Sequence, residues 1–179
     1  MHLCRVLAVA FVALLVLAAA AAAERSTGVV EGCSRQSSAG FPRAFTSSDN
    51  LVVGPLVMVG AGRMTDAATA REFGGNKFPV LVAAGHRVTI ELTRRTRRFA
   101  SLGYGIHRDG AVTVADGHRV VTFRSCSAER ALSRADGRRV TFWSGFVLVS
   151  QPSCVPLRIW IDGETKPRQA RIALGRRCA

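Results

Sequence analysis

The chain has 179 residues, 48% of them hydrophobic, and a formal net charge of +13. This length fits one domain with a buried core once a leader is removed, and it excludes a second full domain. Beyond the first residues the sequence has no internal repeat and no low-complexity tract, which excludes a solenoid or a propeller.

The N-terminus has the pattern of a secretory signal peptide. A single Arg5 precedes an unbroken apolar run, and alanines continue to Ala23 before the first acid, Glu24. We expect cleavage after Ala23, which would remove residues 1–23 and lower the net charge from +13 to +12 by the loss of Arg5. The alternative is an uncleaved membrane anchor, because the apolar stretch just reaches the length of a spanning helix. Cys4 precedes the apolar run, which argues against a lipid-modified N-terminus.

Four cysteines follow the signal peptide, and an even number in an exported chain predicts two disulfides. The sequence allows three pairings. We expect Cys126 to bond with Cys154, bracketing one hairpin, and Cys33 to bond with Cys178, tying the chain ends together. A zinc site is the alternative, and the sequence disfavours it because it lacks a C-x-x-C pair.

The remaining chain divides into two parts. Residues 24–50 mix Gly, Ser, Pro and Arg with few apolar residues, so we expect an irregular N-terminal segment. Residues 51–179 contain short β-rich runs with turns between them, which predicts one all-β domain, an immunoglobulin-like antiparallel β-sandwich. The expected strands lie within residues 52–59, 86–92, 111–114, 119–123, 139–149, 155–161 and 170–174.

One short helix is expected, from Asp66 to Phe73, capped by Thr65 and stopped by two glycines. The glycine-rich run before it, residues 59–65, imitates a dinucleotide-binding turn. Thr65 replaces the third glycine, and no acid follows the next apolar run. We therefore expect a loop between strands rather than a nucleotide site.

Residues 86–92 and 155–161 alternate clearly between apolar and polar side chains, as in half-buried strands. Their apolar residues are expected to face the core. The outward sets are Arg87, Thr89 and Glu91 in the first segment and Pro156, Arg158 and Trp160 in the second.

Arginine accounts for 23 of the 25 basic residues. A dense cluster, expected to form a loop between two strands, consists of Arg94, Arg95, Arg97 and Arg98. Such a loop binds phosphate or sulfate readily, and Trp160, with Arg158 beside it and Arg171 on the next strand, can stack on a sugar ring. Three alternatives stay open: a solvated hairpin end, a tryptophan covered by the N-terminal segment, which we favour, and an arginine content typical of a GC-rich genome.

Catalytic and metal-binding patterns are weak. His107 and His118, with Asp109 and Asp116 nearby, could hold a metal if their segments form a hairpin, but the spacing matches no ligand pattern. Ser144 lacks the first glycine of a nucleophile elbow, and a bend in a long β-ribbon explains it better. We expect neither a bound metal nor a cofactor.

These observations predict a secreted or cell-envelope protein without enzymatic activity. We expect it to bind an anionic polymer or an envelope saccharide through its arginine-rich surface, and not a specific nucleic acid. One alternative is an envelope enzyme or metal-binding protein that uses His107 and His118. Another is a purely structural accessory domain.

Overall fold

The computed structural model describes residues 28–106 and 111–179, and 46% of these described residues are in strands and 10% are helical. These proportions confirm the predicted all-β class. The predicted signal peptide, His107 and Asp109 lie outside the described residues. Within the described ranges, no helix is long and apolar enough to cross a membrane.

The helical pieces are short: α2 (Ala67–Glu72), η1 (Cys33–Arg35), η2 (Thr96–Arg98) and η3 (Val114–Asp116). The strands are β1 (Val29–Glu31), β2 (Gly40–Phe41), β3 (Leu51–Val53), β4 (Leu56–Met58), β5 (Gly75–Lys77), β6 (Val80–Ala83), β7 (Arg87–Leu92), β8 (Ala100–Tyr104), β9 (Val120–Arg124), β10 (Ser133–Ala135), β11 (Arg138–Trp143), β12 (Gly145–Val149), β13 (Ser153–Ile161) and β14 (Arg168–Leu174).

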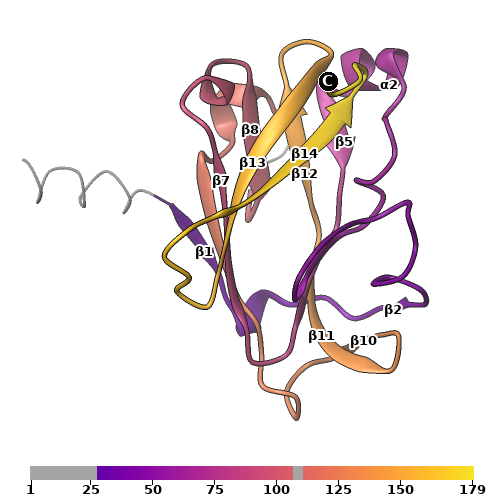
Figure 1. Cartoon of the computed structure of the whole chain (residues 1–179), viewed down its shortest axis with the longest axis vertical. Coiled ribbons are helices and arrows are strands. Elements are labelled where there is room, and N and C mark those ends of the chain that lie inside the picture. The colour runs from indigo at the N-terminus through magenta and orange to yellow at the C-terminus, as the bar shows by residue number, and fades with distance from the viewer. Residues whose placement is uncertain (1–27, 107–110) are drawn as a thin grey trace, which may run out of the picture.

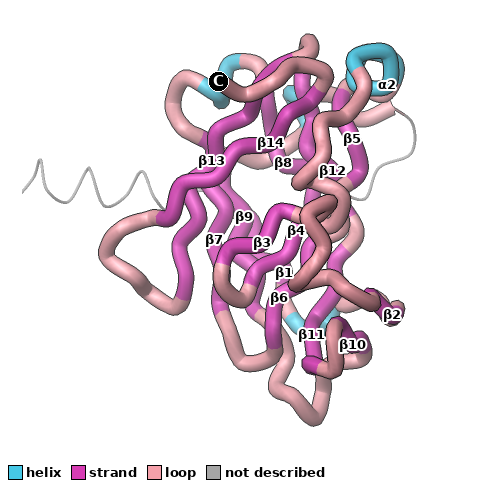
Figure 2. The backbone as a smooth tube through the Cα atoms, turned by 45° about the vertical axis from the view of Figure 1, so that its right-hand side comes forward, coloured by secondary structure: helices cyan, strands magenta, loops and turns pink. Residues whose placement is uncertain are grey.

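The strands form three sheets, in the orders β1-β9-β7-β13-β14, β2-β10-β11-β6-β4-β3 and β5-β12-β8. In Figure 1, α2 and the C-terminus lie at one end of the molecule and the β10–β11 hairpin lies at the other. Apolar side chains from all three sheets share one core, and Figure 2 shows the five-stranded sheet lying against the other strands.

The pairing of β1 with β9 and of β2 with β10 is parallel, whereas the other ladders are antiparallel. This differs from the predicted wholly antiparallel sandwich. Both parallel strands belong to residues 24–50, which we expected to be irregular. They contain only three and two residues, so no alternation of side chains could reveal them.

The six-stranded and three-stranded sheets are consecutive parts of one bent ribbon. Ser144 separates β11 from β12, and Phe78 and Pro79 separate their partners β5 and β6. At the bend the Phe78 N–H donates a hydrogen bond of 3.0 Å to the carbonyl of Gly145. Ser144 therefore lies at a bend, as its sequence context predicts.

The core is centred on three aromatic rings that pack edge-to-face or at a tilt. The ring of Phe123 lies 5.1 Å from that of Tyr104 and 5.2 Å from that of Trp143, measured between centroids. The Tyr104 hydroxyl donates to the Phe78 carbonyl at 2.8 Å, and burial raises the pKa of Tyr104. The inward faces predicted for β7 and β13 are fully buried, as the alternation of their sequences indicates.

Two glycines allow the aromatic rings of β8 and β12 to lie flat on the sheet. A Cβ atom at Gly145 would lie 2.2 Å from the ring of Tyr104, and one at Gly103 would lie 2.2 Å from that of Phe146. Each glycine is directly opposite the residue whose ring covers it. A side chain at either position would displace a ring from this layer.

The cysteines form two disulfides, as predicted, but the expected pairing is wrong. The bonds join Cys33 to Cys126 and Cys154 to Cys178. The parallel pairing of β1 with β9 explains the first bond, because each cysteine follows its strand by two residues. The second bond forms where the chain folds back beyond β14 toward the start of β13.

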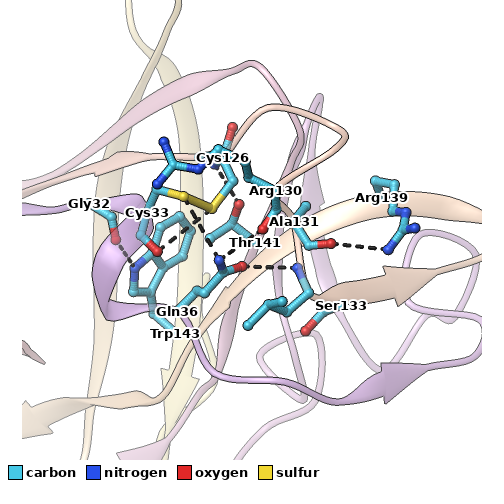
Figure 3. Close-up of a disulfide and its surroundings, with 12 residues drawn as sticks. Gly32, Cys33, Gln36, Cys126, Arg130, Ala131, Ser133, Arg139, Thr141 and Trp143 are labelled. Atoms are coloured by element: carbon cyan, nitrogen blue, oxygen red, sulfur yellow. Dashed lines mark hydrogen bonds between the residues drawn. A yellow bond between two sulfur atoms is a disulfide. The ribbon is translucent and has the colours of Figure 1, made fainter.

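The first disulfide is part of a larger junction between the N-terminal segment and the core (Figure 3). The indole Nε1 of Trp143 donates to the Gly32 carbonyl at 3.1 Å. The Gln36 amide donates to the Arg130 carbonyl at 3.0 Å and accepts from the Leu132 N–H at 3.0 Å. The segment is therefore held by covalent and polar contacts on both sides of η1.

The helix is confirmed, with one correction to its cap. Asp66, not Thr65, caps it, since the Asp66 carboxylate accepts from the Thr69 N–H at 2.9 Å. The backbone of Thr65 is instead hydrogen-bonded to Ala173 and Gly175 at the end of β14. These two hydrogen bonds hold the start of α2 beside the C-terminal end of β14, an edge strand of the five-stranded sheet.

Candidate functional site

The candidate site lies on the outer face of the five-stranded sheet, where side chains of β9, β7 and β13 point to solvent. Hydrogen-bond register places Arg124 directly opposite Arg87, Thr122 opposite Thr89, and Thr89 opposite Trp160. These side chains line a hollow of about 220 Å³, together with Val30, Asp162 and Gly163.

Arg87 and Arg124 form a pair of like charges on adjacent strands. Like charges directly opposite one another on an antiparallel ladder repel, which costs stability. Both side chains are exposed, and neither forms a hydrogen bond or an ion pair with any residue in 28–106 or 111–179. Two guanidinium groups therefore border the hollow with their donors free for a ligand.

Asp162 lies beside this arginine pair, in the tight turn that follows β13. One carboxylate oxygen accepts from the Arg87 N–H at 2.8 Å, and the other lies 2.6 Å from Nδ1 of His86. The hydrogen bond from the Arg87 backbone, followed by the contact with His86 and the charge of Arg87, lowers the pKa of Asp162 despite partial burial. Asp162 is therefore a carboxylate at neutral pH.

A second hollow of about 520 Å³ continues from the first, because it shares Arg87, Arg124 and Asp162 with it. His86 and Ser125 line this part. The residue types suggest a catalytic triad, but the Ser125 hydroxyl donates to the backbone carbonyl of His86 at 2.9 Å. The serine is thus engaged with the backbone and is not activated by the imidazole.

We predict that Asp162→Asn destabilises the protein at pH 7 but not in acid. A lowered pKa in the folded state adds stability above the unfolded pKa, and this stability is lost as the pH falls through the folded pKa. At pH 7 the free energies of unfolding of the wild type and the variant should differ by less than about 1 kcal/mol, because the Asp162 side chain is 44% exposed. Urea unfolding of both proteins at pH 7 and pH 2 measures it. A difference that grows toward pH 2 would contradict this assignment.

Trp160 is held in place by a chain of polar contacts. Its Nε1 donates to one oxygen of Glu91 at 3.2 Å, and the other oxygen of Glu91 lies 3.1 Å from the guanidinium of Arg97. Arg97 also donates to the Leu92 carbonyl at 3.1 Å. These contacts fix the indole of Trp160 and leave Arg97 half-buried.

The structure divides the predicted arginine cluster. Arg97 is part of the polar network that holds Trp160 through Glu91, whereas Arg94, Arg95 and Arg98 are exposed in the β7–β8 loop. This loop follows the end of β7 opposite the one at which Arg87 lies, so it does not line either hollow.

The other predicted surface residues lie on the outer face of the same sheet. Arg158 is directly opposite Glu91, and Arg171 is opposite Pro156. Arg171 donates to the carbonyl of Ala179. The N-terminal segment, which we expected to cover Trp160, is separated from β13 by β9 and β7, and its Val30 lines the far side of the hollow.

The histidine alternative gains no support from the described residues. His118 is hydrogen-bonded through its backbone to Leu102, and Asp116 caps a short turn by accepting from the Thr113 N–H. Its proposed partners His107 and Asp109 lie outside the described residues. In the part of the chain that the structure describes, no group of three or more His, Cys, Asp or Glu side chains could hold a metal ion.

Sequence reasoning missed Arg124, Thr122, His86 and Asp162 as site residues. The outward face of β7 was identified, but its neighbours on the sheet depend on the order and register of β9, β7 and β13. The sequence did contain one indication of the site. Strands β7 and β9 both alternate between buried and outward-facing residues, and each has an arginine at one end of its outward face.

Comparison of the chain with protein-family models, curated proteins and solved structures found no match.

Proposed function

We propose that this protein is an exported, non-enzymatic β-sandwich that binds an anionic saccharide on the outer face of its five-stranded sheet. One observation carries the proposal: the guanidinium groups of Arg87 and Arg124 stand opposite each other, without a hydrogen bond or ion pair to a described residue, beside the indole of Trp160. Such a pair destabilises the free protein, and a bound anion relieves the repulsion.

The chemistry of the hollow supports a saccharide. Guanidinium groups bind carboxylate or sulfate through paired, charge-assisted hydrogen bonds. Aromatic rings such as that of Trp160 provide an apolar surface for the ring of a sugar, and the hydroxyls of Thr89 and Thr122 add polar contacts. The exposed arginines of the β7–β8 loop raise the local concentration of an anionic polymer without contacting it in the hollow.

The two disulfides support a location in an oxidising, extracytoplasmic compartment. Secretion through the N-terminal signal peptide is part of the proposal, as is an immunoglobulin-like relationship between the sheets. A binding domain in the cell envelope would meet acidic polysaccharides there.

We expect Arg87→Gln combined with Arg124→Gln to weaken the binding of anionic oligosaccharides by at least about 100-fold, since each charge-assisted hydrogen bond contributes about 1.5–3 kcal/mol. The matched control is Arg134→Gln with Arg139→Gln. These exposed arginines are also directly opposite each other, but on β10 and β11 of the six-stranded sheet. Isothermal titration calorimetry with uronate and sulfated oligosaccharides provides the measurement.

The control variant should bind the oligosaccharide with an affinity within about threefold of that of the wild type. It removes the same amount of charge, but at a distance from the hollow at which salt screens the interaction. The Arg87/Arg124 variant should also be at least as stable as the wild type without ligand. Equal losses in both variants would show that net charge alone drives binding. Absence of binding by the wild type would favour a structural accessory domain.

A further inference from the structure

We infer that the hollow binds a sugar ring that carries a single carboxylate, with the acid on Arg87 and Arg124 and the ring against Trp160. The ligand is thus an acidic saccharide of uronate type and not a densely sulfated or phosphorylated polymer. This inference rests on the proposed function and specifies its ligand.

The net charge of the hollow favours a ligand with a single anionic group. Two arginines and one aspartate line it, which leaves one net positive charge. The Asp162 carboxylate would repel the closely spaced charges of a sulfated or phosphate chain. A ring with one carboxylate places a single anionic group at the arginine pair and presents only hydroxyls to the rest of the hollow.

The hydrogen-bonding groups fit those hydroxyls. Each carboxylate oxygen of Asp162 accepts one bond within the protein and keeps a second lone pair for a ligand hydroxyl. The hydroxyls of Thr89 and Thr122 lie 2.9 Å apart, so one of them donates to the other. The accepting hydroxyl keeps its own proton for a ligand oxygen.

The hollow is suited to one ring. Its volume of about 220 Å³ is below the range of about 300–1,000 Å³ typical of pockets for larger small molecules. The adjoining hollow of about 520 Å³ shares Arg87, Arg124 and Asp162, so the next ring of a chain would enter it beside His86. Two consecutive rings would then lie on either side of the arginine pair.

Trp160 is positioned before the ligand arrives. Its hydrogen bond to Glu91, and the contact of Glu91 with Arg97, fix the edge of the indole against β7. A fixed aromatic surface loses little conformational freedom on binding, which favours affinity. Glu91 is thus a positioning residue for the binding site.

Tryptophan fluorescence tests the inference directly. The chain has two tryptophans, and Trp143 is only 2% exposed in the core, so a ligand-induced change reports on Trp160. The probes are an oligogalacturonate, the same oligomer with its carboxyl groups reduced to alcohols, and a heparin oligosaccharide of equal length. Trp160→Phe serves as the control that should abolish the fluorescence change while retaining an aromatic ring.

We expect the oligogalacturonate to bind at least tenfold more tightly than either other probe and to change the fluorescence. Trp160→Ala should weaken its binding by about tenfold in calorimetry, and Glu91→Gln should weaken it less. Equal affinity for the reduced oligomer, or unchanged affinity of Trp160→Ala, would overturn the inference. Tighter binding of heparin through Arg87 and Arg124 would also overturn it, yet would leave the proposed function standing, whereas no binding of any probe would contradict both.

Discussion

Replacing Cys33 and Cys126 together with serine is expected to lower the free energy of unfolding by about 4–5 kcal/mol. The bond joins residues 93 apart, and the entropy that a disulfide removes from the unfolded chain grows with the length of the loop it closes. The bond between Cys154 and Cys178 closes a loop of only 24 residues, and its loss should cost about 3–4 kcal/mol.

Urea unfolding of the two double-serine variants, followed by circular dichroism, measures this difference. The Cys33/Cys126 variant should also release the N-terminal segment, because η1 and the Gln36 contacts depend on the bond for their position. Proteolysis within residues 28–50 of this variant, but not of the Cys154/Cys178 variant, would confirm the release. Equal destabilisation of the two variants would contradict the account.

Trp143→Ala should lower the free energy of unfolding by about 3–5 kcal/mol. The side chain is 2% exposed, its ring contacts Phe123, and its Nε1 donates to the carbonyl of Gly32. The substitution leaves a large cavity between the sheets and an unsatisfied carbonyl at the junction of the N-terminal segment.

Two matched variants separate these effects. Trp143→Phe keeps most of the ring and loses the hydrogen bond to Gly32, so it should cost about 1–3 kcal/mol. Trp160→Ala removes the other tryptophan, which is half-buried on the outer face, and should cost less than Trp143→Ala. Thermal and urea unfolding of the three proteins test the order. A larger loss for Trp160→Ala than for Trp143→Ala would contradict it.

The sequence predicts the faces of β7 and β13 well because both strands are long enough to show alternation of apolar and polar residues. The helix was recognisable from the glycines that end it, although its cap was assigned to Thr65 and is Asp66. Strands β1 and β2 are too short for such a pattern, and their parallel partners are distant in sequence. The bond between Cys33 and Cys126 depends on the pairing of β1 with β9, so the disulfide pairing was predicted wrongly.

The residues of the candidate site could be predicted only in part, for the same reason. Arg158 and Trp160 were predicted to face outward because they share the polar side of one strand. The pairing of Arg87 with Arg124 depends on which strands are neighbours and on their register, which local patterns do not specify. Arg97 was assigned to a candidate anion-binding cluster, although its contact with Glu91 makes it part of the polar network that holds Trp160.

NMR can locate the bound saccharide on the surface of the protein. Uniformly ¹⁵N-labelled protein is titrated with an oligogalacturonate, and the shifts of backbone, arginine and indole N–H resonances are mapped on the structure. We expect the largest shifts on the outer face of the five-stranded sheet, at Arg87, Thr89, Thr122, Arg124 and the indole of Trp160. Largest shifts at Arg134 and Arg139, or shifts of equal size at all exposed arginines, would contradict a specific saccharide site on this face.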